Sequence, residues 1–239
     1  ETNDTGAIEC LDREKQDSGN IIQYNRILDV VGLKTTPEGK VLSPYYSWGI
    51  YLDDYSSGII VRGNLVVRTD FGGICIHGGQ NDVVENNIFV DGNTTQIYFS
   101  PIDDFMVNNR FTRNIVAFSA PDATLINPMN RPPAQALSAM DNNLYWHKAG
   151  ADFFKTSELA AKGSKFTPLG SFDQWRAAGF DTHSLIADPL FVNAAEDDYR
   201  LLPNSPAFRL GFEKLPWEKM GMAGFERSFQ PDAMQAYHP

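Results

Sequence analysis

The feature that most constrains the fold is an internal repeat. An asparagine followed by apolar residues recurs along the chain in the neighbourhood of short apolar strands. The marker asparagines are Asn25, Asn64, Asn87, Asn114 and Asn143. Apart from one longer first interval, they are separated by about 20 to 30 residues, which is the spacing of solenoid repeats. The pattern therefore predicts strands that stack rung upon rung.

A second set of strands shares the same register. Its segments are AIECL (7–11), GIYLDD (49–54), GICIHG (73–78) and QIYFS (96–100). Strand side chains alternate between faces, so one apolar pair from each segment can point inward. The inward pairs are Ile8/Cys10, Ile50/Leu52, Ile74/Ile76 and Ile97/Phe99. The register puts the two cysteines, Cys10 and Cys75, on opposite faces, and we predict no disulfide between them.

These patterns predict an all-β parallel β-helix. A sandwich would need hairpin signals, and βαβ units would need helical patterns, which are absent from 49 to 118. We interpret the marker asparagines as an inward ladder in which each amide bonds its neighbours, with contacts to glycan as the alternative. The chain is interpreted as one domain, with rungs over 1–149 and a C-terminal capping region over 150–239.

The capping region changes character. Ser157 to Gly163 and Ser171 to Gly179 are predicted as short helices, because each has serine at its start and glycine at its end. Strand and turn patterns resume at 188–193 and 197–212. Such a region can cover the last exposed rung, so we expect its charged residues to lie at the surface.

Composition and charge exclude some classes of binding partner. The chain has 239 residues and a net charge of −10, which argues against nucleic acid because phosphate binding needs a basic face. Apolar stretches long enough to span a membrane, about 18 residues, are absent. The start at Glu1 without Met suggests that a signal or a preceding module has been removed, so we expect a secreted, periplasmic or cell-surface protein.

The alternate residues of the strands point outward and form two columns. The columns are Glu9, Tyr51, Cys75, Tyr98 and Leu11, Asp53, His77, Ser100. Strand geometry places the Cβ atoms of Glu9 and Asp53 roughly 8 Å apart. Carboxylates that flank a glycosidic bond in hydrolases are ~5 to 9.5 Å apart. The spacing permits a catalytic pair, although outward acidic residues are commonly just solvated.

Three further residues are candidates for catalysis. His77 lies one rung from Asp53, near enough for a hydrogen bond that would fix its tautomer, and imidazole is suited to acid or base catalysis near neutral pH. Asp54 and Asp4 are weaker candidates, because aspartates in turns commonly cap backbone amides. Oxygen ligands from Asp53, Asp54 and Glu9 could hold Ca²⁺, but the spacing fits no known loop, and we predict no metal or other cofactor.

An insertion before the second aligned strand carries aromatic residues. It runs from Leu33 to Trp48. Its Tyr45, Tyr46 and Trp48, with Tyr51 and Tyr98 of the outward column, are candidates for stacking on sugar rings. The alternative is that Trp48 and one tyrosine pack the insertion onto the solenoid.

Several segments resemble a known group of proteins. They are DTGAIE (4–9), SGNIIQYNRI (18–27), SWGIYLDDYSSG (47–58), IHGGQNDVVENNIFVDG (76–92) and ADPLFVN with DDYRLLPNSPA (187–207). The chain resembles the right-handed parallel β-helix proteins of bacterial polysaccharide breakdown, particularly the glycoside-hydrolase-like group. The resemblance implies catalytic acids at Asp4 or Glu9 and at Asp53 or Asp54. Related enzymes are usually longer, so the chain resembles a C-terminal portion, and it is also similar to β-helical carbohydrate-binding modules of xylanases.

Two functions remain open. The first is cleavage of a plant cell-wall-type glycan, xylan-like or pectin-like, by a glycoside hydrolase with Glu9 and Asp53 as the acidic pair and His77 assisting. A lyase using Tyr51 or His77 as base is disfavoured, because few basic residues accompany the columns. The second is a non-catalytic module that binds polysaccharide through its aromatic residues within a larger parent chain. A structural solenoid is a third, weaker interpretation.

Overall fold

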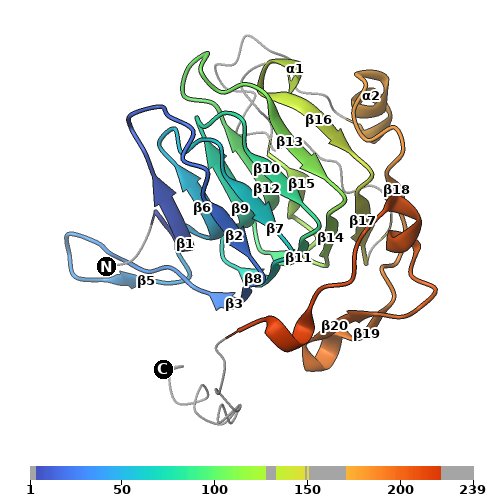
Figure 1. Ribbon diagram of the computed structural model, residues 1–239. Helices are drawn as coiled ribbons and strands as arrows, with labels where there is room; N and C mark the ends of the chain where they lie inside the picture. The colour runs from blue at the N-terminus through green and yellow to red at the C-terminus, as the bar shows by residue number, and fades with distance from the viewer. Residues whose placement is uncertain (1–3, 128–132, 149, 151–170, 222–239) are drawn as a thin grey trace.

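The computed structural model describes residues 4–127, 133–148, 150 and 171–221, and over them the chain is a parallel β-helix (Figure 1). Its rungs contribute to three parallel sheets. The first contains β1 (Thr5–Leu11), β6 (Ser47–Asp53), β9 (Gly72–His77), β12 (Thr95–Ser100) and β15 (Thr124–Ile126). The second contains β2 (Ile21–Gln23), β7 (Ile60–Arg62), β10 (Val83–Glu85), β13 (Asn109–Thr112) and β16 (Leu137–Asp141). The third contains β3 (Arg26–Val30), β8 (Leu65–Thr69), β11 (Ile88–Gly92), β14 (Ile115–Phe118), β17 (Leu144–His147) and β18 (Leu185–Ile186).

Shorter elements lie outside these sheets. They are the antiparallel pairs β4 (Lys34–Thr35) with β5 (Val41–Leu42) and β19 (Phe191–Asn193) with β20 (Asp198–Leu201), the helices α1 (Pro133–Ala136) and α2 (Phe172–Ala177), and the 3₁₀ turns η2 (Ala194–Glu196), η3 (Pro206–Leu210) and η4 (Trp217–Lys219). The β4–β5 hairpin belongs to the insertion and projects from the N-terminal side of the solenoid (Figure 1). In the described part of the chain, no helix is both long and apolar enough to cross a membrane.

The predicted register of the first sheet is confirmed. Ile50 pairs with Ile8 on one side and with Ile74 on the other, and Ile74 pairs with Ile97. The side chains of Ile50, Ile74 and Ile97 are at most 1% exposed, within one continuous core cluster. Full burial of such a side chain is worth about 1.5 to 3 kcal/mol relative to exposure, so this column is a main source of stability. Both cysteines are free, as predicted.

The asparagine ladder is also confirmed. At each step the Oδ1 atom of one asparagine accepts hydrogen bonds from the backbone N–H and the Nδ2 of the asparagine one rung earlier. Asn87 Oδ1 accepts both bonds from Asn64 at 2.9 Å, and Asn114 Oδ1 accepts them from Asn87 at 2.9 and 3.0 Å. The Nδ2 groups also donate to strand carbonyls, such as that of Val61 from Asn87. Buried amides are therefore satisfied without water.

The ladder ends on a buried carboxylate near α2. Asn143 donates from Nδ2 to Asp181, whose side chain also accepts hydrogen bonds from Tyr145, Trp175 and Ser184. Burial raises the pKa of Asp181 to about 6, although these donors oppose the shift. The carboxylate thereby ties the helix to the last rung.

The predicted cap is confirmed where it is described. Ser171 caps α2 by accepting a hydrogen bond from the N–H of Gln174, and Gly179 follows the helix with a φ of +94°. Phe172 and Trp175 of α2 join the solenoid core cluster. The predicted helix over Ser157 to Gly163 lies outside the described residues.

The C-terminal segment covers the outer face of the third sheet. Outward residues of this sheet, such as Leu65 and Ile115, share a cluster with Tyr199, Leu210 and Phe212. The third sheet is therefore covered on its outside, whereas the candidate residues lie on the first sheet or directly beside its strands. A strand from this half of the chain, β18, also pairs with β17 and extends the third sheet beyond residue 149.

Candidate functional site

Adjacent rungs of the first sheet bring Asp53 and His77 into direct contact. Asp53 is the last residue of β6 and His77 the last of β9, and the two strands pair in register. His77 Nδ1 lies 2.8 Å from Asp53 Oδ1. The carboxylate of Asp53 is 15% exposed and the imidazole is 30% exposed. The predicted contact is present, and it holds the ring while leaving part of it open to solvent.

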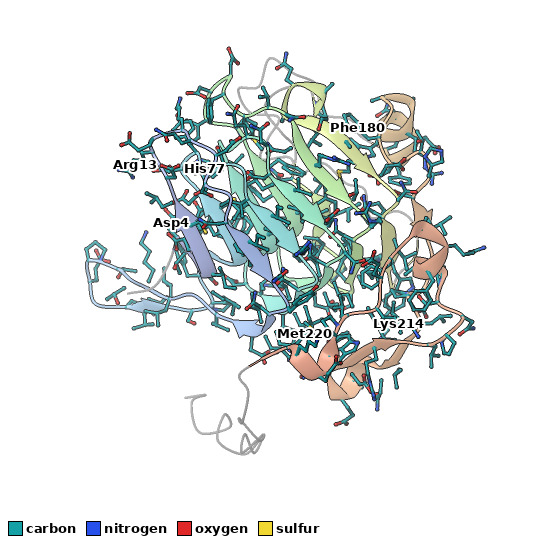
Figure 2. The ribbon with its side chains drawn as sticks, in the orientation of Figure 1. Asp4, Arg13, His77, Phe180, Lys214 and Met220 are labelled. Carbon is teal, nitrogen blue, oxygen red and sulfur yellow. The ribbon has the colours of Figure 1, made fainter. Side chains whose placement is uncertain are left out.

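Asp54 lies beside this pair and forms a salt bridge with Arg13. Its Oδ1 lies 3.7 Å from His77 Nδ1, and its Oδ2 accepts a hydrogen bond from Nε of Arg13 at 2.7 Å. Asp54 has a φ of +32° and Tyr55 one of +66°, so the chain turns sharply out of the strand at this point. Arg13 was not among the sequence candidates, because it lies in a loop after β1 that no repeat register covers. Figure 2 shows Arg13 and His77 on the same side of the molecule.

Tyr51 connects Asp4 to this cluster. Its hydroxyl donates to Asp4 Oδ1 at 3.2 Å, and Asp53 faces the same phenol. Burial raises the pKa of Tyr51 strongly, and the neighbouring Cys75, Asp53 and Asp4 raise it further. The phenol therefore stays protonated and can donate a hydrogen bond to a carboxylate. Asp4, Tyr51, Asp53, Asp54 and His77 form what we call the acidic site.

Glu9 lies beside the acidic site, but its carboxylate turns back onto its own strand. Glu9 pairs with Tyr51, and Leu11 pairs with Asp53, so the predicted offset between Glu9 and Asp53 is correct. Glu9 Oε2 accepts hydrogen bonds from Thr5 Oγ1 at 2.9 Å and from the N–H of Gly6 at 3.2 Å. In this arrangement Tyr51 joins Asp4 to Asp53, whereas the carboxylate of Glu9 is held by Thr5 and Gly6.

The aromatic residues of the insertion and the outward column form a packed cluster. Trp48 is completely buried and Tyr51 is only 4% exposed. The indole of Trp48 contacts the rings of Phe71 and Tyr98, with ring centroids 4.7 and 4.9 Å away. As placed, Trp48 and Tyr51 offer no ring face for a sugar, so packing is their role here. One ring of this cluster, Phe71, is a turn residue that the strand alignment did not cover.

Three of the five predicted stacking residues keep some exposed surface. Tyr46 and Tyr98 are half-buried at the edge of the aromatic cluster, and burial raises the pKa of Tyr46 to about 12. Tyr45 is also half-buried, and Lys34 Nζ lies 5.1 Å from the centre of its ring. Tyr45, Tyr46 and Tyr98 remain candidates for contact with a ligand.

Cation-binding groups meet at one place in the acidic site. A carboxylate oxygen of Asp53, a carboxylate oxygen of Asp54 and a ring nitrogen of His77 all lie within 4.8 Å of one another. This trio differs from the one considered for Ca²⁺ in the sequence, because His77 takes the place of Glu9, and a ring nitrogen suits Ca²⁺ poorly. Arg13 and the hydrogen bond between His77 and Asp53 already engage these atoms. We assign no metal to them.

A hollow of about 230 Å³ lies on the other side of the solenoid, against the third sheet. Its lining is mostly apolar but includes two basic side chains. The lining residues are Ile88, Arg200, Leu201, Phe208, Phe212, Lys214, Leu215 and Trp217. Its separation from the acidic site is visible in Figure 2, where Lys214 is far from Asp4 and His77. No pattern in the sequence indicated this hollow, since its walls come from two segments distant in the chain.

Comparison of the chain with protein-family models, with curated proteins and with solved structures finds no significant match in any of the three.

Proposed function

We propose that the protein is a glycan-cleaving enzyme of the glycoside-hydrolase type and that the acidic site carries its chemistry. The observation that carries the proposal is that Asp4 and Asp53 both face the phenol of Tyr51, while His77 is hydrogen-bonded to Asp53. Glycoside hydrolysis needs two carboxyl groups beside the scissile bond, one of which donates a proton. The acidic site supplies carboxyl groups, an imidazole and a fixed hydrogen-bond donor on one face of a rigid sheet.

The proposed roles follow from the contacts. Asp53 is held by His77, so this pair can transfer a proton while its geometry stays fixed. Asp4 is the second carboxylate, oriented by the phenol of Tyr51, and Asp54 keeps Arg13 beside the pair. Glu9 would take part only after leaving Thr5 and Gly6.

Lyase chemistry fits these contacts less well. A lyase needs a base that removes the proton beside a uronate carboxylate, and a cation that neutralises that carboxylate. The raised pKa of Tyr51 makes its phenol a poor base at neutral pH. Arg13 is already paired with Asp54. Hydrolysis is therefore the better-supported reaction.

A non-catalytic carbohydrate-binding module is the second candidate function. Its argument rests on exposed aromatic residues, and Tyr45, Tyr46 and Tyr98 keep part of their surface. The burial of Trp48 and Tyr51 removes two of the five rings on which such stacking would depend. Binding without chemistry would also leave the contact between His77 and Asp53 without a purpose beyond packing.

A panel of polysaccharides tests the proposal. The purified chain is run through affinity gels that contain either xylan or pectin. The same samples are assayed for new reducing ends and for absorbance at about 235 nm, the signal of lyase products. New reducing ends without the absorbance support a hydrolase. Retention without products would favour the binding module, and absorbance would favour a lyase.

A further inference from the structure

A buried aspartate near the acidic site has an oxygen that finds no partner. Asp82, just before β10, has no exposed surface. Its Oδ1 accepts a hydrogen bond from the N–H of Ile59 at 2.9 Å, but its Oδ2 has no hydrogen-bond partner among the described residues. An ionised carboxylate with a bare buried oxygen is costly, so this atom needs an explanation.

The register of the second sheet supplies one. Val83 pairs with Arg110 and with Ile60, so Asp82 stands between Asn109 and Ile59 in a column where the strands of this sheet begin. Asn109 makes two hydrogen bonds to the rung before it. Its Oδ1 accepts from the N–H of Asp82, and its Nδ2 donates to the carbonyl of Gly79, both at 2.9 Å.

Asp82 repeats the first of these bonds one rung earlier. Its Oδ1 accepts from the N–H of Ile59, as Asn109 Oδ1 accepts from Asp82. Gly79 lies three residues before Asp82, and the matching residue three before Ile59 is Ser56. By this correspondence, Asp82 Oδ2 takes the place of the amide nitrogen and faces the carbonyl of Ser56.

The contacts of Gly79 support this pairing. A Cβ atom built on Gly79 would lie 1.9 Å from the carbonyl oxygen of Ser56 and 2.8 Å from Asp82 Oδ2. The two oxygens therefore crowd the same small space beside Gly79. Two bare acceptors would repel each other there, whereas a proton between them makes a hydrogen bond. We propose that Asp82 is a neutral carboxylic acid at neutral pH and donates from Oδ2 to the carbonyl of Ser56.

The surroundings of Asp82 favour the neutral form. Burial raises the pKa of Asp82 well above its ordinary value, and the negative charge of Asp17 raises it further, while the hydrogen bond from Ile59 opposes the shift. Asp17 is itself held by Asn81, whose Nδ2 donates to both of its oxygens. The thiol of Cys10 also faces Asp82, and burial raises the pKa of that thiol.

The neutral acid ties together two turns that lead out of the acidic site. Ser56 follows Asp53 and Asp54, and Gly79 follows His77. Asp82 is therefore a positioning residue that holds the turn after β6 against the turn after β9. This inference goes beyond the proposed function and does not rest on it, because it concerns the protonation of a structural side chain.

Two measurements test the inference. The first is the free energy of urea unfolding between pH 5 and pH 8 for the wild type, Asp82→Asn and the control Asp17→Asn. A folded chain with one more bound proton than the unfolded chain loses stability as pH rises, so the unfolding equilibrium constant of the wild type should rise about tenfold per pH unit relative to Asp82→Asn. Asp17→Asn should keep most of the wild-type slope. Equal slopes for the wild type and a folded Asp82→Asn would overturn the inference.

The second measurement needs no variant. Carbon-13 NMR of the wild-type chain follows the side-chain carboxyl of Asp82, assigned through its own backbone amide. We expect the chemical shift of a protonated acid, unchanged from pH 5 to pH 8. A shift that moves to the ionised position below pH 7 would overturn the inference, whether or not the variant folds.

Discussion

His77 Nδ1 lies 2.8 Å from Asp53 Oδ1, and the two residues end adjacent strands of one parallel sheet. The solenoid fixes this contact, because each rung repeats the backbone of the rung before it. The side chains therefore meet through register, with little dependence on loop conformation. Rigid placement of this kind suits a catalytic group, since errors of about 1 Å can cost two orders of magnitude in rate.

His77→Gln tests the chemical role of the imidazole. Glutamine can still donate a hydrogen bond to Asp53, but it cannot carry a proton through a reaction. If the acidic site cleaves glycan, product formation should fall about 10²-fold or more, while the thermal midpoint changes little. The measurement is the rate of reducing-end release beside a melting curve. Undiminished release by the folded variant would exclude acid or base catalysis by His77.

Trp48→Ala should act through stability. The indole is completely buried against Phe71 and Tyr98, and truncation leaves a cavity that costs about 3 to 5 kcal/mol. Tyr45→Ala is the matched comparison, because loss of its half-buried ring should lower the free energy of unfolding far less. Urea denaturation measures both. A loss below 1 kcal/mol for Trp48→Ala would show that the aromatic cluster is looser than described.

The asparagine ladder predicts a difference between its interior and its edge. Asn87 is fully buried and joins Asn64 to Asn114, so Asn87→Ala leaves several backbone and amide groups without partners. We expect a loss of roughly 2 to 4 kcal/mol of unfolding free energy. Asn25→Ala, at the first rung, should cost clearly less, since Asn25 is partly exposed. Equal losses at both positions would argue against a cooperative ladder.

The buried Asp181 predicts a dependence of stability on pH. Its folded pKa of about 6 is above the ordinary value of 3.8, so the folded chain holds this proton more tightly than the unfolded chain. The contribution is fully present below about pH 4 and is lost as pH rises through 6, by roughly 3 kcal/mol in total. Urea unfolding of the wild type and Asp181→Asn measures it. An Asp181→Asn slope equal to that of the wild type between pH 4 and pH 6 would contradict this assignment.

Strand register could be predicted from the sequence, because the fold repeats and the repeat leaves its period in the residues. Ile8, Ile50, Ile74 and Ile97 align by pattern alone, and the asparagine ladder follows from the same spacing. The contact between Asp53 and His77 was predictable for this reason. The same period predicted which residues point outward, but it did not predict how exposed each outward side chain is to solvent.

The remaining features depend on segments outside the repeat. Trp48 packs against Phe71, which comes from a turn between strands, as well as against Tyr98 of the outward column. Arg13 reaches Asp54 from the loop between β1 and β2, which is longer than the matching turns after β6 and β9. Asp181 ends the asparagine ladder from far along the chain, after an interval that breaks the period. Each of these contacts joins a repeat position to a residue without a periodic signal, so sequence spacing could not place it.

The most direct test of the central claim compares Asp53→Asn with the wild type on one polysaccharide that the chain retains. Asp122→Asn, at an exposed turn, serves as the matched control. The measurement is the rate of new reducing ends at equal retention on the affinity gel. The proposed hydrolase predicts a loss of about 10²-fold or more for Asp53→Asn and an unchanged rate for Asp122→Asn. Wild-type product release that persists in Asp53→Asn would contradict the account.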